Sequence, residues 1–283
     1  MASASIDTLD FRGQPAISLA TASGARAVVG LFGGQVLSWK PAGGEERLYL
    51  SDSAVFDGAT AIRGGVPVCF PQFATEGALP RHGFARNRAW AVRTRRTGDD
   101  FAMLALGLDA DDATRALWPH DFDLELTVLI EDSRLELELE LTNTGTDDFA
   151  FTAALHTYLR VREVEESRLE GLYGSEYRDS ADGGKLKRDS GDALLIEDET
   201  DRIYHAVQRP LLLREYDRSL GINAEGFPDV VVWNPWETRC AALPDMAALD
   251  FRRMLCVEAA VVQNPVRLAP QAQWWGRQTL VAL

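Results

Sequence analysis

Two polar side chains in otherwise apolar segments are the first candidates for chemistry. His156 lies within residues 154–161 (ALHTYLRV), and Glu258 lies within residues 254–262 (MLCVEAAVV). Side chains alternate along a strand, so His156 would share a polar face with Tyr158, whereas Glu258 would be enclosed by apolar residues on both faces. Glutamate is almost never fully buried without a partner, and imidazole and carboxylate groups transfer protons near neutral pH. Both residues are therefore candidates for acid–base chemistry.

The residues alone leave a structural explanation open for each of them. A histidine on a strand often serves only as a hydrogen-bonded structural group, and a buried glutamate can be held by a neighbouring cation. A third polar segment has the same ambiguity. Residues 62–71 and 79–86 are rich in glycine and proline and carry Arg63, His82 and Arg86. Such rigid loops present polar groups well, but they also occur as plain surface loops with solvated arginines.

Several other chemistries are excluded by missing patterns. The chain has no Gly-x-Gly-x-x-Gly, Walker or Gly-x-Ser-x-Gly motif, and it lacks His-x-x-x-His and paired Cys/His spacings. A metal held by His82, His156 and Glu258 is conceivable, but the pattern disfavours it. We therefore expect neither a metal nor a cofactor.

Charge and cysteine content restrict the partners and the compartment. The 283 residues carry a net charge of −14, which argues against nucleic acid and anionic membranes. A small anion is still compatible, because charges are screened over about 8 Å and a local arginine cluster can hold a phosphate. The odd number of cysteines, three, predicts a reducing cytoplasm and no disulfide framework. No secretory signal and no apolar stretch of membrane-spanning length is recognised.

The elements that must position these side chains are mainly strands. Residues 135–141 alternate Leu and Glu, and residues 124–130 form their expected hairpin partner. Residues 27–38 read as two strands broken by Gly33-Gly34. The other strand candidates are 101–108, 149–161, 210–213, 230–233, 255–262 and 279–283. Helical signals are weak, with one or two turns expected over 246–254, and the polar stretch 175–201 reads as a hairpin or a long loop. We predict an all-β chain with a single domain over residues 1–283, built as a large antiparallel β-sandwich.

A set of motifs, in this order along the chain, resembles the glucose-6-phosphate 1-epimerases, also called hexose-6-phosphate mutarotases, within the wider aldose 1-epimerase group. The resemblance spans about residues 25–283 and rests on Arg63-Gly64-Gly65-Val66-Pro67, Phe70-Pro71, Leu79-Pro80, His82-Gly83-Phe84-Ala85-Arg86, His156-Thr157-Tyr158-Leu159-Arg160-Val161, Thr200-Asp201-Arg202-Ile203-Tyr204, Val231-Val232-Trp233-Asn234-Pro235-Trp236 and Met254-Leu255-Cys256-Val257-Glu258. It implies a galactose mutarotase-like sandwich whose concave face holds one sugar without a cofactor. The chain departs from the pattern after Phe70-Pro71. A bulky apolar residue and Phe-Gly are expected there, and Gln72-Phe73-Ala74 is present.

The resemblance also implies roles for particular residues. His156 corresponds to the catalytic acid and Glu258 to the catalytic base, and His82 corresponds to a second histidine near the ring oxygen. Arg63 and Arg86 correspond to the arginines of the phosphorylated-sugar branch, and Asp201 to a residue that hydrogen-bonds sugar hydroxyls. The implied reaction is the interconversion of the α and β anomers of a hexose 6-phosphate, most simply glucose 6-phosphate.

This reaction needs only one acid and one base. The base takes the proton of the anomeric hydroxyl and the acid protonates the ring oxygen, so the ring opens. The aldehyde then rotates about the bond between C1 and C2, and the ring closes on the other face with the roles reversed. Two alternatives remain: an aldose 1-epimerase for a non-phosphorylated sugar, and a non-catalytic carbohydrate-binding sandwich. We expect a small sugar phosphate as the partner, no nucleic acid, no membrane, and a monomer in preference to an oligomer.

Overall fold

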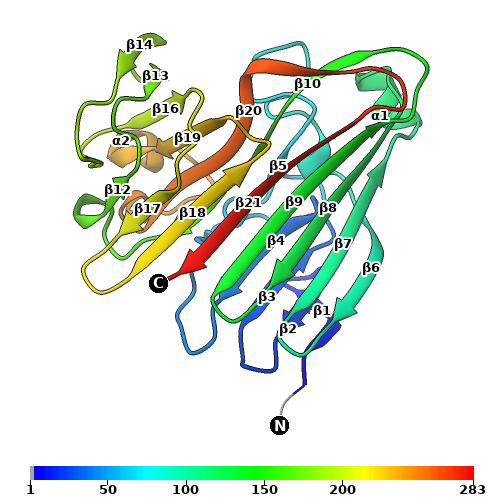
Figure 1. Cartoon of the computed structure of the whole chain (residues 1–283), viewed down its shortest axis with the longest axis horizontal. Helices are drawn as coiled ribbons and strands as arrows, with labels where there is room; N and C mark the ends of the chain where they lie inside the picture. Colours follow the sequence, from blue (N-terminus) through cyan, green and yellow to red (C-terminus); the bar gives the residue numbers. More distant parts are fainter. Residues whose placement is uncertain (1–2) are drawn as a thin grey trace.

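Strands dominate the computed structural model, which describes residues 3–283 (Figure 1). They form three sheets, and the strands of each sheet pair antiparallel. The prediction of an all-β, antiparallel architecture is therefore confirmed.

The largest sheet has nine strands, and the last strand of the chain lies inside it rather than at its edge. In spatial order these are β15 (Ala193–Leu194), β12 (Arg168–Glu170), β17 (Leu211–Arg214), β18 (Ser219–Glu225), β21 (Gln273–Ala282), β9 (Arg134–Asn143), β8 (Phe122–Ile130), β7 (Ala102–Asp109) and β6 (Ala91–Thr97). Figure 1 shows β21, in red, between the yellow β18 and the green β9.

The eight-stranded sheet carries the candidate residues. Its order is β14 (Lys185–Arg188), β13 (Glu176–Asp179), β16 (Thr200–Tyr204), β19 (Asp229–Asn234), β20 (Met254–Leu268), β10 (Phe149–Leu155) and β5 (Val68–Cys69), with β11 (Tyr158–Arg160) also paired to β20. Both candidates belong to the centre of this sheet, because β20 holds Glu258 and the β10–β11 junction holds His156.

The N-terminal strands form a separate meander of four. They are β1 (Ser5–Phe11), β2 (Gln14–Ala20), β3 (Arg26–Gly30) and β4 (Gln35–Lys40). In Figure 1 they lie behind the β6–β9 end of the large sheet, and β1 and β2 contact β6 and β7. The break between β3 and β4 falls at Gly33-Gly34, as predicted.

The main core fills the space between the layers. Leu135, Leu137, Leu139 and Leu141 of β9 are fully buried, and they cluster with Val257 and Ala259 of β20. The predicted hairpin of β8 and β9 is confirmed, with Leu on the inner face and Glu on the outer face. Burying apolar surface stabilises this arrangement by roughly 25 cal/mol per Å².

One strand prediction needs correction. Residues 149–161 do not form one strand: β10 ends at Leu155 and β11 begins at Tyr158, so His156 and Thr157 lie in a break. The helical turn expected over 246–254 is present as the 3₁₀ turn η3 (Asp250–Arg253). The sequence patterns also missed short helices and 3₁₀ turns, namely η1 (Ala85–Asn87), α1 (Asp112–Leu117), η2 (Val164–Glu166) and α2 (Trp236–Ala241).

The polar stretch 175–201 contains the β13–β14 hairpin, which confirms the hairpin alternative for this segment. Its tight turn is tied by Asp179, whose backbone oxygen accepts from Gly184 N at 2.7 Å. Within residues 3–283, none of the helices has the length and apolar character needed to cross a bilayer.

Candidate active site

One cavity of about 560 Å³ is lined by all six residues that the sequence singled out. They are Arg63, His82, Arg86, His156, Asp201 and Glu258. These residues are spread over almost 200 positions of the chain, and the eight-stranded sheet with its flanking loops gathers them. The cavity volume lies in the range typical of small-molecule sites.

His156 is held at the break between two strands. Its backbone N–H donates to Pro67 O at 2.9 Å, and Thr157 N donates back to Leu155 O at 2.9 Å. The imidazole stacks on the Tyr158 ring with centroids 4.7 Å apart and planes inclined by 11°. Because the chain leaves the regular ladder here, the ring points into the cavity while the strands on either side stay paired.

Glu258 sits at the centre of β20, opposite Val231 of β19, and its residue is only 1% exposed. Its Oε1 lies 3.3 Å from His156 Nε2. Among the described residues, neither Glu258 Oε2 nor His156 Nδ1 has a hydrogen-bond partner, although both atoms are buried. Unpaired buried polar atoms are unfavourable in a folded protein, so this arrangement suits a polar ligand that supplies the missing contacts.

Burial changes the ionisation of this pair. It raises the pKa of the Glu258 carboxyl well above its usual range, and the nearby Asp201 raises it further. It lowers the pKa of His156 well below its usual range, with neighbouring His82 and Arg86 adding to the effect. Both shifts favour uncharged groups. The carboxyl and the imidazole lie 3.3 Å apart, so the two groups exchange protons as a coupled pair.

His82 lies next to His156, with ring centroids 5.4 Å apart. Its backbone adopts a φ of 66°, a left-handed conformation that non-glycine residues rarely use and that often marks functional sites. The ring Nδ1 accepts from Ala74 N at 3.3 Å and lies 3.2 Å from Cys69 Sγ. Burial, followed by the positive Arg86, lowers the pKa of His82 to about 2, so this imidazole is neutral and serves as a hydrogen-bonding group.

Two close backbone approaches shape the loop that presents Arg63, His82 and Arg86. A Cβ atom at Gly65 would lie 2.1 Å from Val36 O, and one at Gly83 would lie 2.1 Å from Phe70 O. Both glycines also have positive φ, so only glycine fits these positions. Phe70 anchors the loop from below, because its ring packs edge-on against an aromatic cluster of the core that includes Phe122 at 5.4 Å.

The sequence departs from the family pattern at Gln72-Phe73-Ala74. Two of these residues line the cavity and the third stabilises the loop. Phe73 and Ala74 line the cavity. Gln72 is buried and closes the loop instead: its Nε2 donates to Ala74 O and to Leu79 O, and its Oε1 accepts from Leu79 N at 2.9 Å.

The arginines of the cavity differ in whether a carboxylate of the protein already neutralises their charge. Arg63 is committed, because its Nε pairs with Asp245 Oδ2 at 3.1 Å and its Nη1 donates to Tyr158 Oη at 3.0 Å. Arg86 donates only to the backbone oxygen of Arg81, at 2.8 Å. Within residues 3–283, neither Arg81 nor Arg86 has a carboxylate within 4.0 Å, and the Arg86 Nε is buried without a partner. These two cations are therefore available to an anionic ligand.

The opposite wall of the cavity comes from β16, α2 and the β13–β14 hairpin. Asp201 of β16 lies 3.6 Å from Arg239 of α2, and burial raises the pKa of its carboxyl. Gly183 and Gly184 of the hairpin turn also line the cavity. The polar stretch 175–201 is thus part of the site.

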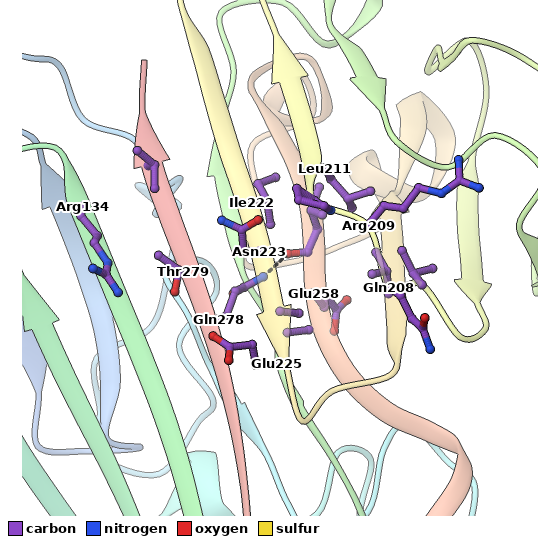
Figure 2. Close-up of a pocket in the computed structure, with 17 residues that line it drawn as sticks. Arg134, Gln208, Arg209, Leu211, Ile222, Asn223, Glu225, Glu258, Gln278 and Thr279 are labelled. Carbon is purple, nitrogen blue, oxygen red and sulfur yellow. Dashed lines mark hydrogen bonds between the residues drawn. The ribbon is translucent and has the colours of Figure 1, made fainter.

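A second cavity of about 450 Å³ lies on the other side of β20, with walls from β17, β18 and β21 (Figure 2). In Figure 2, Gln278 of β21 reaches toward β20, and the Glu258 carboxylate points away from it. Gln278 Oε1 accepts from Thr157 Oγ1 at 2.5 Å, and its Nε2 donates to Val257 O at 3.0 Å. One buried side chain therefore ties together the residues that follow His156 and precede Glu258.

The side chains of His156, Cys256 and Glu258 are the described group that comes nearest to a metal site, with ligand atoms within 4.8 Å of one another. Burial raises the pKa of the Cys256 thiol well above its usual range. A metal ion held by Cys256 would have to displace the thiol proton, which this burial opposes. The three cysteines are free thiols in the structure.

Sequence patterns did not single out several cavity residues, namely Arg81, Arg178, Arg239 and Trp233. Arg81 directly precedes His82 in a recognised motif, so its position was a usable signal. Arg178 and Arg239 carried none, because a polar hairpin and an unpredicted helix bring them to the site.

Comparison with known proteins identifies the family and the fold. The family model for aldose 1-epimerase matches residues 15–280. A protein of Cenchrus ciliaris named "Putative glucose-6-phosphate 1-epimerase" is 39% identical over 267 residues, covering 91% of this chain and 81% of the relative. A Salmonella typhimurium protein of the same name is 34% identical over 85% of this chain and 81% of its own length. The crystal structure of a "putative mutarotase" from Salmonella typhimurium superposes with a TM-score of 0.91 at 30% identity, covering 98% of this chain and 93% of the other.

Proposed function

The chain belongs to the aldose 1-epimerase family, and we propose that it interconverts the α and β anomers of a hexose 6-phosphate, with glucose 6-phosphate as the preferred substrate. The observation that carries this proposal is the buried pair of His156 and Glu258, 3.3 Å apart, beside two arginines without carboxylate partners. The names of the relatives support the choice of a phosphorylated glucose.

The pair supplies the acid and base that ring opening requires. One group accepts the proton of the anomeric hydroxyl, the other donates a proton to the ring oxygen, and the bond between C1 and the ring oxygen breaks to give the open-chain aldehyde. Rotation about C1–C2 presents the other face of the carbonyl. The ring then closes by the reverse transfers, so the pair ends with the one proton it began with.

The ionisation of the pair decides which group starts. Burial shifts both pKa values toward the uncharged forms, and we propose that the proton starts on Glu258. His156 is then the base and Glu258 the acid in the first half of the reaction, and they exchange roles in the second. The resemblance had implied the opposite assignment for ring opening. The two assignments use the same single proton, so what the mechanism requires is that the pair holds one proton and not two or none.

The uncommitted arginines are suited to the phosphate. Guanidinium groups form charge-assisted and often bidentate bonds to phosphate oxygens. We assign Arg86 and Arg81 to the phosphoryl group, and Arg63 to holding Tyr158 and the cavity wall. His82, as a neutral imidazole, is assigned to a sugar ring oxygen and Asp201 to sugar hydroxyls.

We also propose that residues 1–283 form one domain. A single hydrophobic cluster supports this, since it contains Ile17 of β2 as well as Leu280 of β21. The proposed partner is a small sugar phosphate. We propose that the protein acts on it as a monomer in the cytoplasm.

One observation favours the alternative function, an aldose 1-epimerase that acts on free sugars. Arg63, one of the two arginines expected at the phosphate, is already paired with Asp245. Exchange NMR on α-glucose 6-phosphate beside α-glucose decides between them. Faster enzyme-dependent exchange of the phosphorylated sugar supports the proposal, equal or faster exchange of glucose supports the alternative, and binding without exchange would identify a carbohydrate-binding module.

A further inference from the structure

A second cationic cavity lies away from the active site. It has a volume of about 580 Å³ and shares no lining residue with the active-site cavity. We call it the basic cleft, and its lining residues are Lys40, Glu45, Glu46, Arg160, Val161, Arg162, Arg218 and Arg253. Five of these eight residues are cationic, although the whole chain carries a net charge of −14.

Only part of this positive charge is neutralised within the protein. Arg162 and Arg218 share Glu45, at 3.2 and 3.3 Å, and each has one further carboxylate partner. In the part of the chain that the structure describes, Lys40, Arg160 and Arg253 have no carboxylate within 4.0 Å.

Glu46 does not compensate them, because it is used locally. Its Oε1 accepts from Trp39 N at 2.8 Å and from Leu48 N at 3.0 Å, and its Oε2 accepts from Ser38 Oγ at 2.5 Å. Three cations of the basic cleft are therefore left without a counter-charge.

Arg47 adds a buried cation to the same cluster. It is 9% exposed, its Nε is buried without a hydrogen-bond partner, and no carboxylate lies within 4.0 Å of it among residues 3–283. Its backbone oxygen accepts from Arg160 N at 2.8 Å, which places it beside the basic cleft. Burial, followed by the positive Arg218, lowers the pKa of Arg47. Glu215 and Glu45 offset part of this effect without contacting Arg47, and an anion bound in the basic cleft would add to that compensation.

We propose that the basic cleft is a second anion site, which binds the phosphoryl group of a small phosphorylated metabolite. Arginines favour phosphate because their donors match its oxygens in pairs. The cleft is as large as the active-site cavity and has room for a compact metabolite. The strongly negative chain as a whole repels long polyanions, which restricts the ligand to a small molecule.

Calorimetric titration with inorganic pyrophosphate tests the site. The active-site arginines would also bind this probe, so the full-length chain carries Arg81→Gln and Arg86→Gln as the common background. We expect measurable binding there, and a dissociation constant at least about tenfold higher when Arg160→Gln and Arg253→Gln are added. The matched control is Arg26→Gln with Arg96→Gln, two exposed arginines on β3 and β6, which should change binding less than about twofold. Absence of binding in the background, or equal loss in the control, would overturn the proposal.

A second variant tests the buried cation. In the same background, Arg47→Met removes the unpaired charge while keeping most of the side-chain volume, so without anion its melting temperature should equal or exceed that of the background protein. Pyrophosphate should raise the melting temperature of the background protein and leave that of the Arg47→Met variant unchanged. A pyrophosphate-induced rise of the same size in both proteins would show that Arg47 has no part in binding.

Discussion

Strands β9 and β20 both carry glutamates, but the glutamates of β9 face solvent and the glutamate of β20 is buried. On β9, Glu136 and Glu138 alternate with buried leucines and face outward, where Arg277 binds Glu138 at 2.6 Å. On β20, Glu258 lies between fully buried neighbours and has one unpartnered oxygen. The first strand meets the ordinary rule for a half-buried sheet, and the second breaks it at one position.

This difference shows how a sheet provides both stability and chemistry. A glutamate on the solvent side of β9 keeps its hydration and its charge, and its contribution to stability is small. A glutamate at the centre of β20 loses hydration, which raises its pKa and favours the protonated form that the proposed reaction uses. The consequences of this contrast can be ranked by the size of the effect that each variant should produce.

The largest effect is expected at the catalytic pair. His156→Ala and Glu258→Gln should each lower kcat for anomer exchange by about 100-fold or more, the usual contribution of a general acid or base, with a smaller change in KM. Exchange NMR or polarimetry measures this. The matched control is Glu138→Gln on β9, which should leave kcat unchanged and lower the free energy of unfolding by no more than about 1 kcal/mol. A folded Glu258→Gln enzyme with near-normal exchange would refute the mechanism.

The second effect concerns the phosphate. Arg86→Gln should lower kcat/KM for glucose 6-phosphate by about 10- to 100-fold and leave that for glucose nearly unchanged, because a charged contact in a partly desolvated site is lost. Arg63→Gln should change the ratio of the two specificity constants less, since Arg63 is already held by Asp245. If the ratio is the same in wild type and in the Arg86 variant, this residue does not read the phosphate.

A smaller effect is expected behind the pair. Gln278→Leu removes the bond to Val257 O and leaves the Thr157 hydroxyl only its long bond to Leu155 O, at 3.4 Å, so it should lower the free energy of unfolding by about 1–3 kcal/mol. Because both contacts flank the catalytic pair, kcat should also fall by about tenfold with little change in KM. Leu137→Ala on β9 provides the comparison: it should destabilise by about 2–5 kcal/mol and keep kcat. Equal kcat values in the two variants would show that Gln278 contributes to stability and not to catalysis.

The smallest effect is expected from moderate changes of pH. Activity falls on the acid side when His156 takes up a second proton, and its lowered pKa moves this limb below that of an ordinary imidazole. Activity falls on the alkaline side when the pair loses its only proton, and the raised pKa of Glu258 moves this limb upward. Between them, kcat should vary by less than about twofold from pH 6 to pH 7. Free glucose is the substrate to use, since phosphate itself ionises near pH 6. A steep rise centred near pH 6.5 would indicate an ordinary, hydrated histidine.

Much of the fold follows from local sequence. Alternation over 135–141 predicts β9 and its orientation correctly, because one face of the strand packs on the core and the other meets water. The strands β1, β2, β6 and β18 were missed, since polar and small residues interrupt their apolar pattern. Their strand conformation depends on pairing with neighbours, which single-sequence patterns do not record.

Some features of the candidate site could be predicted from the sequence and others could not. The six residues selected from the sequence line one cavity, and the burial of Glu258 could be expected from its apolar neighbours. The shifted pKa values of the pair could not, because they depend on burial and on charged neighbours from distant parts of the sequence. Nor could the pairing of Arg63 with Asp245 or the bridge made by Gln278, since both depend on side chains that only the tertiary fold brings together.

The central placement of β20 and β21 has a consequence for biosynthesis. β21 pairs with β18 and β9, and β20 pairs with β19, β10 and β11, so each of these two late strands joins segments that leave the ribosome earlier. At about 5–20 residues per second, residues 254–283 take a few seconds to make. During that interval, both sheets present open edges that invite pairing with other chains. We therefore expect shielding by the ribosome or a chaperone to reduce misassociation of the nascent protein, and Glu258 arrives with the strand that closes the sheet.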